Sequence, residues 1–204
     1  LNTGINVSSK EIIACIDVDC ILSHESLTRM VRPFMEETHR KVIAVGGAIG
    51  IANNCDVQDG TVTKYRVPTT AFLMGRMAWT RVNVLMLISG AFGFFNRELV
   101  VEVGGYFPKT VGEDMELVVR MRRYMEERKL PYKVGFVPDP LCWTEVPEQE
   151  EILSRQRNRW IRGTIETLQL HRVTRLNPNY GIMGMLSYPY WNIYEKMAPV
   201  LELL

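Results

Sequence analysis

The sequence lacks the features by which several classes of protein are recognised. No stretch reaches the roughly 18 consecutive apolar residues that a membrane-spanning helix needs, and no signal peptide opens the chain. There is no internal repeat and no low-complexity linker. The cysteines form no CxxC pair and have no histidine at zinc-site spacing, which excludes a structural zinc site and favours reduced thiols at Cys15, Cys20, Cys55 and Cys142.

The chain also has no excess of charge of either sign. It carries 24 lysines and arginines against 23 aspartates and glutamates, for a net charge of +1. A nucleic-acid-binding protein usually has a clearly basic balance, so we do not expect nucleic acid as the main partner. With 204 residues, of which 47% are hydrophobic, the composition is that of an ordinary α/β protein of one or two domains.

Strands and helices are predicted to alternate along the chain. An apolar run predicts a buried strand at 11–16, Ser23 is a candidate cap for the helix that follows, and residues 42–52 predict a second strand. After a polar loop at 53–60, residues 61–87 are expected to be mostly helical, with an interruption at Pro68.

The second half of the chain continues this alternation. We predict a strand at 87–95, short strands at 133–137 and 141–144 that are separated by Pro138-Asp139-Pro140, and helices at 97–103, at 113–129 and from near Glu148. Gly104-Gly105 is expected to end the first of these helices. Such alternation predicts a largely parallel, wound sheet.

Two carboxylates follow the first predicted strand. Residues two apart on a strand point to the same side, so Asp17 and Asp19 are expected to reach one small volume just past the strand end. Ligands bind at that edge of open α/β sheets, and paired carboxylates suit Mg²⁺ or Mn²⁺ shared with substrate phosphates. A plain strand-end turn is the alternative interpretation.

A second acidic pair, Glu113-Asp114, opens a predicted helix. One interpretation is structural, because acidic residues are favoured at a helix N-terminus whether or not they take part in a reaction. The other is that one of the two carboxylates is a general base, which must lie within hydrogen-bond reach of the acceptor hydroxyl. Upstream, Ser89-Gly90-Ala91 is expected to allow a close approach of the backbone to a ligand, with a strand bulge as the alternative.

The last long helix carries an amide, a guanidinium and an indole on one face. Gln156, Arg159 and Trp160 stand at i, i+3 and i+4, so their side chains converge. Arginine binds phosphate oxygens in bidentate fashion and an indole can stack on a sugar ring, so the patch suits a phosphorylated sugar. An outward-facing helix with one packed tryptophan gives the same pattern.

In this order the motifs resemble those of the membrane-bound family 2 glycosyltransferases, among them the cellulose, hyaluronan and poly-N-acetylglucosamine synthases. The likeness covers roughly residues 1 to 175, and its most specific part is QxxRW with its spacing from the ED pair. It extends to Ser89-Gly90-Ala91-Phe92 before Arg97, Val103-Gly104-Gly105-Tyr106, Pro138-Asp139-Pro140-Leu141-Cys142-Trp143 and Thr144-Glu145-Val146-Pro147.

The resemblance implies a GT-A-type α/β domain in residues 1–175 that is incomplete at its N-terminus. The start of the chain matches the middle of the family domain and a later gating loop is absent, so we expect this part alone to be inactive. Gly112 stands where many synthases carry threonine. Residues 176–204 are rich in methionine, leucine and aromatic side chains, and we expect amphipathic helices in a membrane interface, against another helix or in the core.

The resemblance also implies a role for each motif. Asp114 would be the general base and Glu113 would shape the site around it. The nucleotide would contact Asp17, and Asp19 would hold Mg²⁺ or Mn²⁺. The remaining residues would line the substrate: Gln156 and Arg159 at the diphosphate, Trp160 at the acceptor sugar, and Ser89 and Gly90 at the donor sugar pocket.

The implied reaction is inverting transfer of a sugar from a UDP-sugar to a growing β-linked polysaccharide. It would take place at the cytoplasmic face of the inner or plasma membrane, on a protein anchored by flanking helices outside this chain. Two alternatives are non-processive transfer to a lipid acceptor and a non-catalytic nucleotide-sugar binding module. A phosphatase-like domain is disfavoured because the lysine context of such enzymes is missing.

Overall fold

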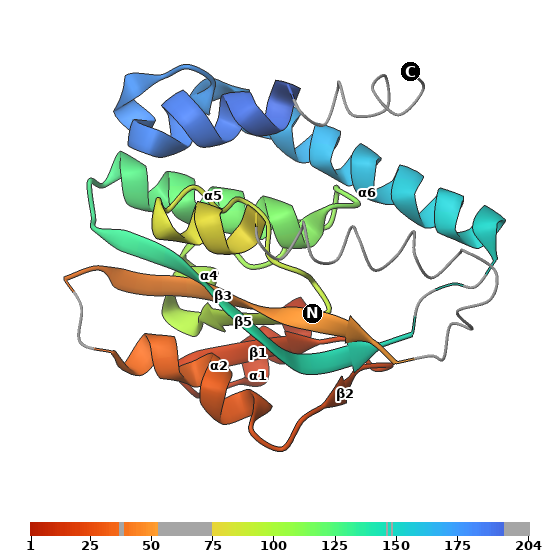
Figure 1. The fold of residues 1–204 in the computed structure, drawn as a ribbon. Helices are drawn as coiled ribbons and strands as arrows, with labels where there is room; N and C mark the ends of the chain where they lie inside the picture. The colour runs from red at the N-terminus through yellow and green to blue at the C-terminus, as the bar shows by residue number, and fades with distance from the viewer. Residues whose placement is uncertain (37–38, 53–74, 146, 148, 194–204) are drawn as a thin grey trace.

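A computed structural model describes residues 1–36, 39–52, 75–145, 147 and 149–193. A five-stranded sheet forms the middle layer (Figure 1). Helix α2 (Ser26–Met35) covers one face of the sheet, and α4 (Arg97–Glu102) and α5 (Glu113–Glu127) pack on the other. Helix α6 (Glu150–Leu170) lies outside α5. The Asn2 side chain of α1 (Asn2–Val7) donates to the Tyr106 carbonyl oxygen and accepts from the Tyr106 N–H.

The strands are ordered β1-β4-β3-β5-β2. Among the described strands, β3 and β5 are the one parallel pair, and the three other neighbouring pairs are antiparallel. The prediction of a largely parallel sheet was therefore wrong. Alternation of strands and helices along the chain does not determine the relative direction of neighbouring strands. Here β4 lies between β1 and β3 and runs antiparallel to both. The strands are β1 (Ile12–Ile16), β2 (Ile21–Leu22), β3 (Lys41–Ile51), β4 (Phe92–Asn96) and β5 (Tyr132–Thr144).

Alternate side chains of the central strands fill two cores. On β4, Phe95 packs toward α5 while Phe94 packs toward α2, as the two-residue period of a strand requires. On β3, the neighbours Ala44 and Val45 divide between the same two layers, and both are fully buried. A strand that is apolar on both faces marks the middle of the sheet.

The predicted strand at 87–95 begins only at Phe92. Residues 84–88 are a largely buried apolar run without a strand partner. The guanidinium of Arg122 donates to the carbonyl oxygens of Asn83 and Leu85, both at 2.6 Å, and so replaces a strand ladder there. The Asn83 amide also bonds the Tyr132 carbonyl and the Val134 N–H of β5. Side chains therefore satisfy backbone groups that a neighbouring strand would otherwise pair.

The two strands predicted on either side of Pro138 are one strand with a bulge. The pairing of β5 with β3 passes from Val137 opposite Gly47 to Pro140 opposite Ala48, so the two intervening residues protrude. One of them, Asp139, forms an ion pair with Arg29 of α2 at 3.2 Å. A proline pair thus bends the strand without ending it.

Other predictions agree with the structure more closely. Helices α4 and α5 match the predictions, and Gly104 and Gly105 follow α4 with φ of 90° and 72°. The expected cap Ser23 lies too early, because α2 is capped at Glu25. Residues 75–81 and 181–193 are helical, whereas 53–74, with Cys55 and Pro68, lie outside the described residues. In the described part of the chain, no helix is long and apolar enough to cross a bilayer.

Candidate active site

Asp17 and Asp19 lie just past the end of β1 and are exposed to solvent. The Asp17 N–H donates to the Ala91 carbonyl oxygen at 3.2 Å, and the Asp19 carboxylate accepts from the Thr144 hydroxyl at 3.3 Å. Burial raises the pKa of the Cys142 thiol to about 12, and the negative charges of both aspartates add to that rise. Both carboxylates therefore lie on the side of the sheet edge where β5 ends.

These two carboxylates are the described groups best suited to a divalent cation. No cluster of three or more histidine, cysteine, aspartate or glutamate side chains with metal-site geometry occurs among the residues that the structure describes. Mg²⁺ and Mn²⁺ do not require one, because they are commonly bound by one or two carboxylates together with substrate phosphates and waters. Asp17 and Asp19 fit that donor set.

Ser89 and Gly90 form the turn that links Asp17 to the second acidic motif. The carbonyl oxygen of Ala91 accepts from the Asp17 N–H, as described above. The N–H of the preceding residue, Gly90, donates to the Asp114 carboxylate at 3.0 Å. A Cβ on Gly90 would lie only 3.1 Å from the same Asp114 oxygen, so a larger residue here would displace that carboxylate by a few tenths of an ångström. Two hydrogen bonds thus join Asp17-Val18-Asp19, the DxD motif, to Glu113-Asp114, the ED motif, almost 100 residues away in sequence.

Asp114 is held at the start of α5 as a half-buried carboxylate. One oxygen accepts from Gly90, and the other accepts from the Met115 N–H at 2.7 Å. Burial raises the pKa of Asp114, while these backbone donors and the positive charge of Arg76 oppose the rise. A desolvated carboxylate with a raised pKa is a better proton acceptor than an exposed one.

Arg76 is a buried cation near this carboxylate that sequence reasoning missed. The residue is 6% exposed, and its guanidinium lies 5.8 Å from the centre of the Phe136 ring. Burial lowers the pKa of Arg76 to about 9, and the negative charge of Asp114 opposes that change. Arg76 is one of three arginines in the segment 61–87, and nothing in the sequence singles it out or pairs it with an acid 38 residues later.

Helix α6 is held against the loop that precedes the ED pair. Gly163 meets Gly112 so closely that a Cβ on Gly163 would be 2.7 Å from the Gly112 backbone. The Glu166 carboxylate accepts from the Thr110 hydroxyl and the Val111 N–H, both at 3.1 Å. The position of α6 is therefore fixed relative to Asp114 by backbone contact and by hydrogen bonds.

The residues of the QxxRW motif lie on the face of α6 that carries Gly163. Gln156, Arg159 and Trp160 are seven, four and three residues before this glycine, which brings all four to one side of the helix. Gln156 is half-buried, and Arg159 and Trp160 are exposed, with Trp160 at 57%. In Figure 1 this half of α6 extends beyond the start of α5, toward the side where β3 and β5 end.

The structure does not bring these three side chains into contact with the acids. Among the described residues, no hydrogen bond or ion pair joins Gln156, Arg159 or Trp160 to Asp17, Asp19 or Asp114. Glu113 is half-buried beside Asp114. A common site for the QxxRW residues and the acids therefore stays a prediction.

A buried charged network ties the C-terminal end of α6 to α5. His171 Nε2 lies 3.2 Å from the Glu116 carboxylate, and both side chains are about 95% buried. Arg120 binds Glu116 through two nitrogens, at 2.8 and 2.7 Å, and also donates to the Val103 and Gly105 carbonyls. Burial raises the pKa of Glu116, but His171 and Arg120 outweigh it and leave that pKa below its usual range.

The sequence matches the model of the glycosyl transferase family group 2 over residues 12–197. The chain belongs to this family. Within the family it is 29% identical over 204 residues to the poly-beta-1,6-N-acetyl-D-glucosamine synthase of Staphylococcus aureus. The synthase of the same name from Staphylococcus epidermidis is 26% identical over 170 residues, or 82% of the chain. The former match covers 98% of the chain and 45% of the relative, so this family 2 chain spans about half the length of those synthases.

One solved structure has a similar fold. The mannosyltransferase PcManGT from Pyrobaculum calidifontis, in complex with GDP-Man and Mn²⁺, superposes on the whole chain with a TM-score of 0.64 at 18% identity, over 53% of its own length. The predicted GT-A-type α/β fold and the predicted family 2 glycosyltransferase are therefore confirmed, although the sheet is mixed rather than parallel.

Proposed function

We propose that the protein is an inverting glycosyltransferase that moves a sugar from a UDP-sugar to a growing β-linked polysaccharide. The observation that carries this proposal is the position of Asp114, which is desolvated at a helix N-terminus and joined through Gly90 and Ala91 to Asp17. The likeness to poly-beta-1,6-N-acetyl-D-glucosamine synthases favours a polysaccharide product over a single sugar on a lipid. The whole protein would work at the cytoplasmic face of a membrane.

Asp114 acts as the general base in this mechanism. As the acceptor oxygen attacks the anomeric carbon, its proton passes to the Asp114 carboxylate, whose raised pKa favours uptake. The bond from the anomeric carbon to the diphosphate breaks on the opposite face, so an α-linked donor gives a β-linked product. Glu113 shapes the site beside the base, and Ser89 and Gly90 line the donor sugar.

The leaving diphosphate is bound from two sides. Asp17 contacts the nucleotide and Asp19 holds Mg²⁺ or Mn²⁺, which when bound would neutralise charge on the departing phosphates. Gln156 and Arg159 donate hydrogen bonds to the diphosphate from α6, and a preorganised arginine stabilises charge that grows in the transition state. Trp160, with its exposed indole, stacks on the acceptor sugar.

A panel of UDP-sugars offered to the intact protein with Mn²⁺ tests this proposal. We expect one donor to yield UDP and a polymer, and calorimetry should show metal-dependent UDP binding that Asp19→Ala abolishes and the exposed neighbour variant Val18→Ala retains. Metal-dependent binding without turnover of any donor would instead indicate a non-catalytic binding module. A product limited to one sugar on a lipid would indicate the non-processive alternative.

A further inference from the structure

Helix α5 begins with the ED motif but has no side-chain cap of its own. Its N-cap residue is Gly112, and no side-chain hydrogen bond caps the helix at that position. A serine, threonine, asparagine or aspartate at an N-cap normally fixes the point where a helix begins. The first turn of α5, which carries Asp114, therefore depends on how residues 110–112 are held, and we call these three residues the entry loop.

Two neighbouring residues of α6 bind the entry loop. One oxygen of the Glu166 carboxylate accepts from the Thr110 hydroxyl and from the Val111 N–H, both at 3.1 Å. The hydroxyl of Thr167, a fully buried residue, donates to the Gly112 carbonyl oxygen at 3.4 Å. Each residue of the loop is thus bonded to α6, and Glu166 supplies two of the three bonds.

The charge of Glu166 strengthens its bonds to the loop. Its other oxygen accepts from Arg162, one helical turn earlier, at 2.7 Å. The hydrogen bond from Arg162, followed by that from the Val111 N–H, lowers the pKa of Glu166, so the carboxylate is ionised at neutral pH. Hydrogen bonds to an ionised acceptor are stronger than those between neutral groups. Arg162 is 72% exposed whereas Thr110 is 9% exposed, so the bond to Thr110 is better shielded from water than the ion pair.

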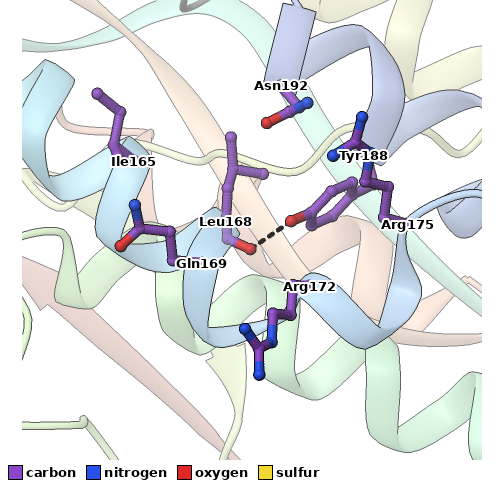
Figure 2. Close-up of a pocket in the computed structure, with 7 residues that line it drawn as sticks. All are labelled: Ile165, Leu168, Gln169, Arg172, Arg175, Tyr188 and Asn192. Carbon is purple, nitrogen blue, oxygen red and sulfur yellow. Dashed lines mark hydrogen bonds between the residues drawn. The ribbon is translucent and has the colours of Figure 1, made fainter.

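Helix α6 is also held by contacts that do not involve Glu166. Leu168 belongs to the same buried apolar cluster as Met115 of α5. The Leu168 carbonyl oxygen accepts from the Tyr188 hydroxyl, as Figure 2 shows. Just beyond the end of α6, His171 bonds Glu116 of α5. Loss of the Glu166 carboxylate should therefore release the entry loop while α6 stays in place.

We propose that Glu166 is a positioning residue for sugar transfer: by holding the entry loop against α6, its carboxylate orients Asp114 toward the acceptor hydroxyl. This inference rests on the proposed function, in which Asp114 is the general base. Asp114 follows the loop by two residues, and its oxygens are directed by the N–H groups of Gly90 and Met115. A shift of the loop changes how these bonds hold the carboxylate, and a general base must lie within hydrogen-bond reach of the proton that it takes.

Steady-state kinetics of the intact protein test the proposal with two variants of one residue. In Glu166→Ala the bonds to the loop are lost, and we expect kcat to fall on the order of 10- to 100-fold because the base is misplaced. The KM for the donor should change little, because the proposed donor contacts Asp17 and Asp19 are unaltered. In Glu166→Gln the amide oxygen can still accept both bonds from the loop, so this variant should recover most of the lost turnover.

Glu151→Ala is the matched control. Glu151 is also on α6 and pairs with an arginine one helical turn away, but this ion pair, with Arg155, is exposed at both side chains. The control should keep the kcat of the wild type. Unchanged kcat in Glu166→Ala, or an equal loss in Glu166→Ala and Glu166→Gln, would overturn the proposal, as would a loss of the same size in the control.

Hydrogen exchange of the intact protein reads the entry loop without any turnover. We expect amides of the peptide 108–118 to exchange on the order of 10-fold faster in Glu166→Ala, and at the wild-type rate in Glu166→Gln and Glu151→Ala. Unchanged exchange in Glu166→Ala would show that the carboxylate does not hold the loop. If the wild type turns over no donor, the proposed function fails, and exchange alone then decides whether Glu166 holds the loop.

Discussion

The contact between Gly163 and Gly112 offers the most specific test of how α6 is positioned. Replacing Gly163 with alanine adds a Cβ that would lie 2.7 Å from both the N and the Cα of Gly112. Both atoms are backbone, so no side chain can rotate away. The substitution therefore acts on the spacing between α6 and the loop before Asp114, and it replaces no side chain of the QxxRW motif.

The size of the displacement follows from these distances. Ordinary contacts of a Cβ lie at 3.4–4 Å, so α6 must move from Gly112 by about 0.7 to 1.3 Å. Strain of this kind costs about 1–3 kcal/mol, and the better helix propensity of alanine returns up to about 1 kcal/mol. A misplacement of about 1 Å at a catalytic site can reduce the rate on the order of 10²-fold. We expect a large loss of turnover with a modest loss of stability.

Steady-state turnover and the thermal melting midpoint of the intact protein measure the two effects. Gly4→Ala is the matched control, because Gly4 also lies in a helix but nothing is within 4 Å of its added Cβ. The control should keep full turnover. Full turnover in Gly163→Ala, with the melting midpoint unchanged, would refute the claim that this contact sets the distance between the QxxRW face and Asp114.

Three further predictions concern charged groups near the site. Arg76→Met removes a positive charge that opposes the rise in the pKa of Asp114, so the acidic limb of the pH–rate profile should move to higher pH while KM for the donor changes little; an unmoved limb contradicts it. His171→Phe leaves the buried Glu116 short of a partner and should cost about 1–3 kcal/mol of stability in denaturant unfolding at neutral pH. Because the pKa of Glu116 is lowered by folding, this difference should fade as the pH drops and Glu116 is protonated, and a loss independent of pH would contradict the ion-pair explanation. The folded-state pKa of Asp114 is raised, so its ionisation opposes folding, and Asp114→Asn should gain melting temperature relative to the wild type as the pH rises through that pKa; a constant difference argues against it.

Local sequence patterns predicted the elements that carry the site. The apolar run before Asp17, the paired glycines at 104–105 and the helical spacing of Gln156, Arg159 and Trp160 depend on near neighbours, and each matches the structure. The DxD and ED motifs could be proposed for one cleft only through the family resemblance. Their actual link, through Ala91 and Gly90, is a tertiary contact that neither motif encodes alone.

The failed predictions depend on partners distant in sequence. Residues 84–88 are apolar enough for a strand, but Arg122, 37 residues beyond Leu85, takes up the carbonyl oxygens that a strand would pair. The direction of β4 in the sheet is likewise set by how the chain returns to it. Gly163 could have been singled out from the sequence, because a glycine inside a helix lowers the stability of the helix and often marks a close backbone contact. The sequence could not have identified Gly112 as the residue that it contacts.

The turnover of Asp114→Asn, measured together with its affinity for UDP, tests the central claim most directly. We predict that transfer by the intact protein falls on the order of 10²- to 10⁴-fold, because the substitution removes the proton acceptor. The Kd for UDP in the presence of Mn²⁺ should remain nearly that of the wild type, since Asp17 and Asp19 are unaltered. Equal turnover in the two proteins, or a parallel loss of UDP binding, would contradict the assignment of Asp114 as the general base.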